Sequence, residues 1–348
     1  MATVTIIGIG QMGSALAFVA AHNGNQIRMV GSPVDDAVVE ACIRDGKHPK
    51  MDIPYPKGIQ YYYCKDWEKA VEGTDFVIGA ISSFGVEWFL EDILKSLAPS
   101  VIVLSLAKGL VELPGGKLVS YPDYWVRELR KCGIRRNIYA LGGPGTADGI
   151  IRKDHTHVVI CGKDSSVLKM MKESLQTPWF HISITKDARG LETAVAIKNA
   201  YALGIAMALG YARKLHGNQE EAFYNSQACV FYQAIKEMIR ILDMQGANFD
   251  STLIGIGDLY VTATGARTRK LGLLLGEGKT CEEAQEILGG MTLESLVVIR
   301  RLAQSITERA RKGQVNLNDF PLLQFVIGVL DSGTMTDLPW DKFTFVTL

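Results

Sequence analysis

Residues 3–17 read Thr-Val-Thr-Ile-Ile-Gly-Ile-Gly-Gln-Met-Gly-Ser-Ala-Leu-Ala, and this stretch decides the fold. Its β-branched start predicts a buried strand over Thr3–Ile7, and its small apolar end predicts a helix. Between them, Gly8 permits a tight turn, Gly10 lets a diphosphate approach the backbone, and Gly13 lets strand and helix pack closely. The free N–H groups at the helix start attract phosphate. The alternative is a tight turn without a ligand. We expect a dinucleotide to be bound by Gly8, Gly10, Gln11, Met12 and Gly13.

Strands and helices alternate through the first half of the chain. Further strands are expected at Gln26–Val30, Phe76–Ile81, Val101–Leu106, Ile138–Leu141, Val158–Cys161 and Phe180–Ile184. Helices are expected at Gly13–His22, Asp35–Arg44, Val86–Leu97 and Ser165–Leu175. This alternation indicates an α/β fold with a doubly wound, parallel sheet. From about Ala188 helical periodicity dominates. We therefore expect an N-terminal Rossmann domain over residues 1–188 and an all-helical C-terminal domain over residues 189–348.

The composition limits the partners and the compartment. Hydrophobic residues make up 47% of the 348 residues, and 37 Lys plus Arg balance 37 Asp plus Glu. Without excess positive charge, neither nucleic acid nor an anionic membrane surface is expected as a partner. A strand beginning at Thr3 leaves no room for a signal peptide, and the longest apolar run, Ala200–Ala212, is too short for a membrane span. Six scattered cysteines suit reduced thiols in the cytoplasm, without disulfides or zinc: Cys42, Cys64, Cys132, Cys161, Cys229 and Cys281.

The residues after the second expected strand bear on the choice between NAD and NADP. An acidic residue about 20 positions beyond the glycine turn binds the ribose of NAD, but this chain reads Val-Gly-Ser-Pro at residues 30–33. Ser32 could donate a hydrogen bond to a 2′-phosphate, and Arg28 lies on the preceding strand. Asp35 and Asp36 come later and could cap the next helix. We expect NAD or NADP as the cofactor, with NADP slightly favoured.

A lysine interrupts the most apolar helix of the chain. Residues 191–212 are almost entirely apolar apart from Lys198 and Asn199. A helix that is apolar all round is normally buried, and a buried ammonium needs a partner, a solvated cleft or a shifted pKa. The simple alternative is a lysine whose stem lies along the core while its head reaches water.

Further polar residues follow in the helical half. Asp258 stands in the sequence Gly-Ile-Gly-Asp-Leu at residues 255–259, followed by Thr262 and by Thr268-Arg269-Lys270. Taken singly, an aspartate among glycines often only forms a turn, and two adjacent cations often form a solvated face. In combination with Lys198 and the glycine turn, they form a known pattern.

The chain resembles the NAD(P)-dependent glycerol-3-phosphate dehydrogenases from its first strand to about residue 330. The order and spacing of the motifs are more specific than any one motif. They are the Gly8–Gly13 turn, Ser105-Leu106-Ala107-Lys108-Gly109, Gly143-Pro144, Ala147, Ile197-Lys198-Asn199, Tyr201-Ala202, Asn225, Glu237-Met238, Gly257-Asp258-Leu259, Thr262, Arg269 and Glu294. The resemblance implies hydride transfer between NAD(P)H and the C2 carbonyl of dihydroxyacetone phosphate, giving glycerol 3-phosphate. It further implies a cytoplasmic enzyme of glycerophospholipid metabolism, and the small apolar residues of the helical half suggest a homodimer.

The resemblance gives three residues catalytic roles. Lys198 would be the general acid that protonates the carbonyl oxygen as the hydride arrives. Asp258 would orient Lys198 by a hydrogen bond. Lys108 would lie at the carboxyl edge of the sheet, where ligands bind in such folds.

The resemblance also implies the ligand contacts. Arg269 would hold the substrate phosphate, because a guanidinium fork matches phosphate oxygens. Thr262 would contact the substrate, and Lys270 would add a positive charge. Asn199 would hold either the substrate or Lys198 itself. Beyond the glycine turn and Ser32, the cofactor contacts would come from Lys108, Ala147, Arg269 and Glu294.

Four positions depart from the family pattern. The family usually has Asn at Lys270, Arg at Gln233, Glu at Gly149 and Gly at Ser295. These changes put the substrate, and not the chemistry, in question, since Lys270 suits a phosphate, a carboxylate or a second anionic group. Two alternatives stay open: a reductase of a keto acid, opine or ketopantoate type on the same scaffold, and a non-catalytic dinucleotide sensor.

Two other clusters have simpler interpretations. His155 and His157 alternate at strand spacing and could pair on a metal, but the sequence offers no third ligand nearby, so no metal site is expected. Tyr61-Tyr62-Tyr63 suits an extended edge or packing segment better than a base-stacking platform.

Overall fold

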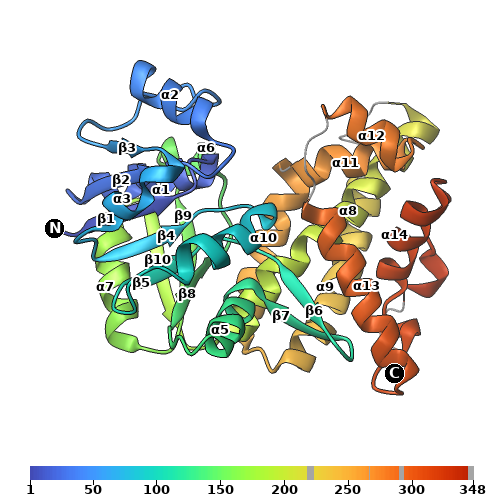
Figure 1. The fold of residues 1–348 in the computed structure, drawn as a ribbon. Coiled ribbons are helices and arrows are strands. Elements are labelled where there is room, and N and C mark those ends of the chain that lie inside the picture. The colour runs from blue at the N-terminus through green and yellow to red at the C-terminus, as the bar shows by residue number, and fades with distance from the viewer. Residues whose placement is uncertain (218–222, 266, 290–293, 344–348) are drawn as a thin grey trace. The chain divides into compact units, whose positions relative to one another are not determined.

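The computed structural model describes residues 1–217, 223–265, 267–289 and 294–343, which form two compact units (Figure 1). The first unit comprises Met1–Lys108 and Ser120–Glu192, and the second comprises Gly109–Val119 and Thr193–Leu348. The sequence analysis placed its boundary after residue 188, and the two units change between Glu192 and Thr193. The expected division differs in one segment, because residues 109–119 leave the first unit and belong to the second.

An eight-stranded sheet forms the centre of the first unit. Its strands run in the order β10-β9-β8-β5-β4-β1-β2-β3. They are β1 (Thr3–Ile7), β2 (Gln26–Val30), β3 (Gln60–Tyr62), β4 (Phe76–Gly79), β5 (Ile102–Ser105), β8 (Ile138–Gly142), β9 (Thr156–Cys161) and β10 (Phe180–Thr185). All pairs are parallel except β8 with β9. Every expected strand is present, and the tyrosine run contributes β3, an edge strand.

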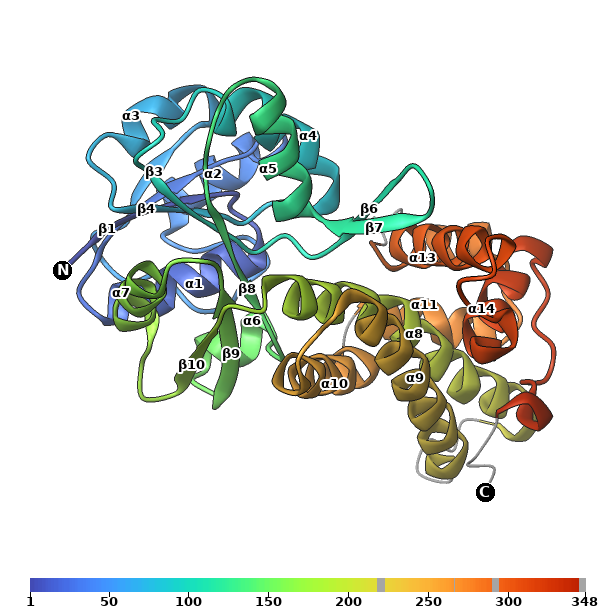
Figure 2. The ribbon, with the colours of Figure 1, turned by 90° about the horizontal axis from the view of Figure 1, so that it is seen from below.

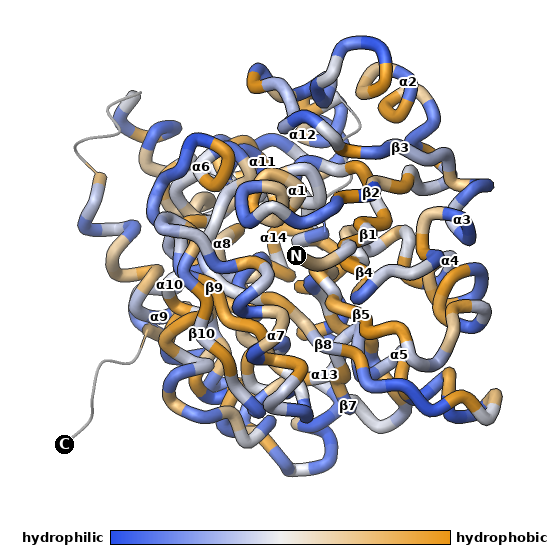
Figure 3. The backbone as a smooth tube through the Cα atoms, turned by 90° about the vertical axis from the view of Figure 1, so that its left-hand side faces the viewer, coloured by the Kyte–Doolittle hydropathy of each residue, from blue (hydrophilic) through white to orange (hydrophobic). Residues whose placement is uncertain are grey.

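Helices cover both faces of this sheet, as a doubly wound fold requires. They are α1 (Gln11–His22), α2 (Asp36–Asp45), α3 (Trp67–Val71), α4 (Val86–Trp88) with a π-helical continuation η3 (Phe89–Leu94), α5 (Tyr121–Lys131), α6 (Ala147–Ile151) and α7 (Ser165–Leu175). Two short 3-10 turns, η1 (Cys64–Asp66) and η2 (Ser83–Gly85), complete the unit. The central strands carry mainly hydrophobic residues (Figure 3), and Ile6, Phe76 and Leu104 are fully buried.

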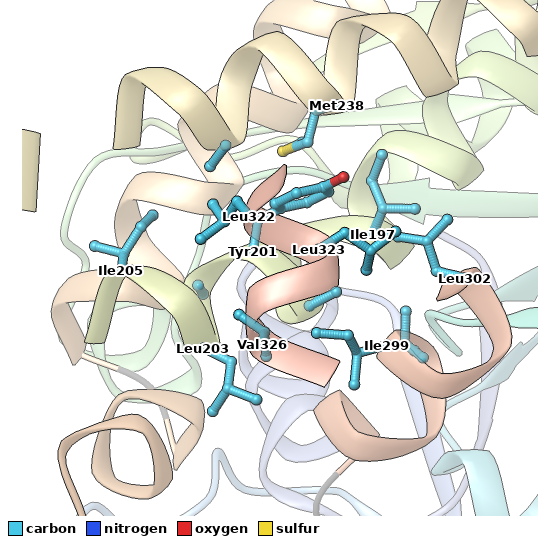
Figure 4. Packing of buried hydrophobic residues seen from close by; sticks show 14 of the residues in the cluster. Ile197, Tyr201, Leu203, Ile205, Met238, Ile299, Leu302, Leu322, Leu323 and Val326 are labelled. Carbon is cyan, nitrogen blue, oxygen red and sulfur yellow. The ribbon is translucent and has the colours of Figure 1, made fainter. Parts of the chain in front are cut away.

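The second unit is built around α8 (Ala188–His216), which begins at the end of the first unit. Its other helices are α9 (Tyr224–Gln245), α10 (Phe249–Gly265), α11 (Arg267–Gly276), α12 (Cys281–Ile287), α13 (Glu294–Arg311) and α14 (Pro321–Ser332), with the short turns η5 (Leu317–Asp319) and η6 (Trp340–Lys342). Figure 2 shows α9, α11 and α14 gathered around α8. In Figure 4, Tyr201 of α8 lies beside Met238 of α9 and Leu323 of α14.

The length and composition of α8 would also suit a membrane span. It has 29 residues with a mean hydropathy of 1.3 in its most apolar window, and 94% of that window is buried inside the protein. The sequence analysis identified only the shorter run Ala200–Ala212. Such burial is what the core helix of a helical domain requires.

The described part of residues 189–348 has helical secondary structure, as expected, and a hairpin from earlier in the chain joins it in the second unit. Strands β6 (Leu110–Leu113) and β7 (Lys117–Ser120) form a two-stranded sheet, and residues 109–119 of this hairpin belong to the second unit. The Ser305 hydroxyl on α13 donates to the Gly116 carbonyl over 2.6 Å, and the Arg301 guanidinium donates to the Leu110 carbonyl. Gly115 and Gly116 form the turn at positive φ. This Gly-Gly pair is a hairpin signal that the sequence analysis overlooked.

Candidate active site

The glycine turn has the geometry that a dinucleotide needs. A Cβ at Gly8 would lie 2.5 Å from the Ala80 carbonyl oxygen and one at Gly13 would lie 2.4 Å from the Gly8 carbonyl oxygen, so neither position tolerates a side chain. A Cβ at Gly10 would meet nothing within 4 Å, which leaves this backbone open to a ligand. Helix α1 begins at Gln11 without a side-chain cap or an acidic residue in its first turn. The residues present therefore fit a bound diphosphate.

A cavity of about 360 Å³ continues from this turn past the end of β2. Its lining includes Gly8 and Gly10 of the turn, Ser32 and Asp35 after β2, and the aromatic residues Phe84 and Trp88. The Asp35 carboxylate accepts hydrogen bonds from the Ser32 N–H over 2.8 Å and from the Ser32 hydroxyl over 2.6 Å. Because Asp35 folds back in this way, its side chain does not cap α2, which was one sequence expectation.

The basic residue expected beside this cavity is engaged elsewhere. The Arg28 guanidinium donates to the backbone carbonyls of Ala70 and Glu72. Arg28 thus braces β2 against the end of α3. The cavity wall formed by Ser32 and Asp35 carries a carboxylate.

Lys108 lies just beyond β5, at the carboxyl edge of the sheet. Its ammonium donates to the Gly143 carbonyl over 3.2 Å, so Lys108 links the loops that follow β5 and β8. Ala147, a second expected cofactor contact, begins α6 after the capping residue Thr146. Both lie at the edge where parallel strands of this fold type receive ligands.

Close helix packing in the second unit brings Lys198 and Asp258 together. A Cβ at Gly255 would lie 2.6 Å from the Cβ of Ala194, so only glycine allows α10 to approach α8 this closely. Lys198 follows Ala194 by one helical turn, and Asp258 follows Gly255 by about one turn. The Lys198 ammonium and the Asp258 carboxylate form a direct ion pair, with Lys198 only 7% exposed and Asp258 fully buried. The sequence-predicted pairing of these residues is therefore present.

Thr262 lies one turn after Asp258 on α10, and Arg269 lies on the following helix, α11. The Thr262 hydroxyl donates to the Asp258 backbone carbonyl over 2.7 Å. The Arg269 guanidinium donates to the Ala263 carbonyl over 3.2 Å. Burial lowers the pKa of Arg269, and the nearby Arg213 guanidinium lowers it further. Sequence reasoning missed Arg213, whose only signal was its place in the last turn of α8.

The remaining expected contacts are less enclosed. Asn199 and Glu294 are half-buried, the latter at the start of α13, whereas Lys270 is exposed on α11. Exposure of Lys270 agrees with the simple interpretation of a solvated cation.

The departure at Gln233 lies in a buried network. Gln233 is 2% exposed and donates from its amide to the Glu237 carboxylate over 2.8 Å. Glu237 also accepts from the N–H groups of Leu322 and Leu323, so it caps α14. Burial raises the pKa of Glu237 to about 7. An arginine at 233 would bring a positive charge to this carboxylate, which the amide does not.

The two other positions that depart from the family pattern, Ser295 and Gly149, lie in ordinary helical surroundings. Ser295 is 2% exposed near the start of α13, and Gly149 lies in α6 with the Thr146 hydroxyl 3.0 Å from where its Cβ would be.

The histidines do not form the pair that strand spacing suggested. His155 meets His181 of β10, with Nδ1 and Nε2 2.9 Å apart, while His157 contacts the Ser183 hydroxyl. Within the described ranges, no group of three or more His, Cys, Asp or Glu residues could hold a metal ion.

Both halves of the chain match models of one family. Residues 3–168 match the N-terminal domain of NAD-dependent glycerol-3-phosphate dehydrogenase, and residues 187–338 match its C-terminal domain. The chain belongs to this glycerol-3-phosphate dehydrogenase family. The resemblance inferred from the motifs is thereby confirmed.

Relatives support the same assignment over most of the chain. The NADP(+)-dependent glycerol-3-phosphate dehydrogenase of Archaeoglobus fulgidus is 30% identical over 82% of this chain and 83% of its own length. A glycerol-3-phosphate dehydrogenase (NAD(P)+) of Clostridium botulinum is 28% identical over 83% of each chain.

Solved structures confirm the fold class. The glycerol-3-phosphate dehydrogenase of Coxiella burnetii superposes with a TM-score of 0.81 at 22% identity, covering 98% of this chain and 97% of that one. A ketopantoate reductase family protein of Ralstonia eutropha gives 0.57 at 18% identity, covering 95% and 99%. The combination of a Rossmann domain and a helical domain therefore also occurs outside the glycerol-3-phosphate dehydrogenase family.

Proposed function

We propose that this protein catalyses the NAD(P)H-dependent reduction of dihydroxyacetone phosphate to glycerol 3-phosphate. The observation that carries the proposal is the buried Lys198–Asp258 ion pair. A non-catalytic dinucleotide sensor has no need of an ammonium held in this way in its helical domain.

The residues of the second unit would do the acid chemistry. When bound at the glycine turn, a reduced nicotinamide would supply the hydride for C2 of the ketone. Lys198 would donate its proton to the oxygen that becomes the hydroxyl. Asp258 keeps the ammonium in place before transfer and stays close by as the lysine is reprotonated. The Arg269 guanidinium, with Arg213 nearby, would bind the phosphate dianion.

The test of this function is a reductase assay on a matched pair of lysine variants. Lys198→Met should lower kcat by roughly 10²–10⁴-fold, the usual contribution of a general acid. Lys214→Met removes an exposed lysine of the same helix and should leave kcat unchanged. A panel that includes keto acids and ketopantoate addresses the substrate. Near wild-type turnover of Lys198→Met, or faster turnover of an unphosphorylated keto acid, would refute the proposal.

We further propose that NADH is preferred to NADPH, against the initial expectation from Ser32. The support is the Asp35 carboxylate, which lines the cavity beside the glycine turn and already accepts the Ser32 hydroxyl. The 2′-phosphate of NADPH would be repelled by this carboxylate, because both are negatively charged. The ribose hydroxyls of NADH can donate hydrogen bonds to it. The relative from Archaeoglobus fulgidus is named for NADP(+), so on this proposal the two proteins differ in their cofactor preference.

Direct binding measurements test this preference apart from turnover. Asp35→Asn should tighten NADPH binding relative to NADH, as measured by quenching of protein fluorescence. Asp36→Asn, which changes the exposed neighbouring carboxylate, should leave the ratio unchanged. A wild-type preference for NADPH would count against this role of Asp35.

The family setting also supports a cytoplasmic homodimer that supplies glycerol 3-phosphate to glycerophospholipid metabolism. Helices α9 and α10 expose large apolar side chains that a second subunit could cover: Tyr224, Tyr232, Ile239, Phe249, Leu253 and Tyr260. Sedimentation equilibrium should give twice the chain mass. A monomer at micromolar concentration would contradict the dimer.

A further inference from the structure

A second polar cavity lies in the first unit, away from the glycine turn. Its volume is about 670 Å³, and it is lined by Arg130, Gly133, Arg135, Arg136 and Asn137. Arg136 and Asn137 immediately precede β8, and Arg136 reaches the Val101 carbonyl just before β5. The cavity therefore opens at the amino ends of these strands. The glycine turn follows the carboxyl end of β1, which runs parallel to them, so the two cavities lie at opposite edges of the sheet.

Arg136 is a fixed cation in the wall of this cavity. It is 7% exposed, and its guanidinium donates to the carbonyls of Val101, Leu97 and Ala98 over 2.6–2.9 Å. These bonds occupy three of the five N–H donors of an arginine. Its buried Nε finds no hydrogen-bond partner among the described residues. Backbone carbonyls hold the side chain in place without neutralising its charge.

Arg130 and Arg135 add two exposed guanidiniums. Neither makes an ion pair with any residue that the structure describes, and no carboxylate lines the cavity. Lys131, which lies beside Arg130 in sequence, is already paired with Glu128 over 2.7 Å. In a protein of zero formal net charge, three uncompensated cations around one cavity are a local excess.

Compensation of the α5 dipole explains only part of this excess. Basic residues in the last turn of a helix offset its negative end, and Arg130 lies in that turn. Arg135 and Arg136 lie beyond the end of the helix, and Arg136 is oriented by the Leu97–Val101 loop instead.

We propose that this cavity binds a phosphorylated small molecule. Guanidinium forks match phosphate oxygens, three of them suit a ligand with more than one negative charge, and the volume lies in the range of small-molecule sites. The Asn137 amide can supply a further donor or acceptor. The site is distinct from the dinucleotide turn and does not depend on the proposed reaction.

The test is isothermal titration of the full-length protein with inorganic diphosphate at constant ionic strength. The double variant Arg130→Gln/Arg135→Gln should lose one binding event or weaken it about tenfold or more, because two charge-assisted contacts are removed. Arg136 is kept, since it holds the loop. The matched control Lys131→Gln removes a neighbouring cation that does not line the cavity, and it should bind as wild type does.

Three outcomes would overturn the proposal. Unchanged binding in the double variant would place diphosphate elsewhere, for example at the glycine turn or Arg269. An equal loss in Lys131→Gln would indicate unspecific attraction to a basic surface. Equal affinity for citrate would refute recognition of phosphate.

Discussion

Removing one member of the Lys198–Asp258 pair should destabilise the second unit more than removing both. Lys198→Met leaves the fully buried Asp258 carboxylate without its ammonium partner. Asp258→Leu leaves the buried Lys198 ammonium without its carboxylate partner. Breaking a buried ion pair in this way costs about 3–5 kcal/mol in the free energy of unfolding. In the double variant Lys198→Met/Asp258→Leu, apolar side chains of similar size fill the space, and the loss should stay below about 1.5 kcal/mol. The coupling between the two sites is then several kcal/mol.

The tryptophans allow the two units to be followed separately in guanidinium chloride. Trp67, Trp88, Trp125 and Trp179 lie in the first unit, and only Trp340 lies in the second. Tryptophan fluorescence therefore reports mainly the first unit, while far-UV circular dichroism is weighted to the long helices of the second. We expect the single variants to shift the dichroism transition and to move the fluorescence transition little.

The free energies of unfolding of the single and double variants show whether Lys198 and Asp258 are energetically coupled. If the double variant loses as much as the sum of the singles, the two residues are not energetically coupled and the pair does not stabilise the packing of α8 on α10. A loss below about 1 kcal/mol in both single variants would mean that water reaches the pair in solution.

Three further predictions rest on single residues. Burial raises the pKa of Glu237 to about 7, so the native state holds a proton that the unfolded state releases near pH 4.5, and stability should fall by about 3 kcal/mol as pH rises from about 4.5 to 7. Glu237→Gln should flatten this part of a thermal-stability profile, and an unchanged slope would contradict the assignment. Gly13→Ala places a Cβ 2.4 Å from the Gly8 carbonyl oxygen, so NADH binding measured by fluorescence should be lost, and retained affinity would show that the turn can relax. Arg269→Ala should raise KM steeply for dihydroxyacetone phosphate but little for dihydroxyacetone in steady-state assays; equal effects would remove Arg269 from the phosphate site.

The sequence was most informative where local signals and the fold agree. Thr3–Ile7 and Ser165–Leu175 were predicted with their observed bounds, because hydrophobic periodicity and flanking residues define both ends. Lys198 and Asp258 were paired only through the family resemblance. Their 60-residue separation carries no local signal, and the contact depends on Gly255.

Three features of the structure were not predicted from the sequence. Ser32 was interpreted without Asp35 because the carboxylate folds back only in the three-dimensional turn. Arg28 was considered for a phosphate, but the carbonyls that occupy it lie more than 40 positions away. The β6–β7 hairpin was missed although Gly115 and Gly116 signal its turn, and its contact with α13, nearly 200 residues later, has no local signal.

That hairpin has a consequence for biosynthesis. The Gly116 carbonyl accepts its hydrogen bond from Ser305, which the ribosome adds 189 residues later. At usual translation rates of about 5–20 residues per second, this delay is roughly 10–40 s. During that time the first unit can fold, while the apolar side chains of the hairpin are not yet covered by α13. The nascent chain therefore passes through a stage in which a short edge strand is exposed and can pair with other chains or bind chaperones.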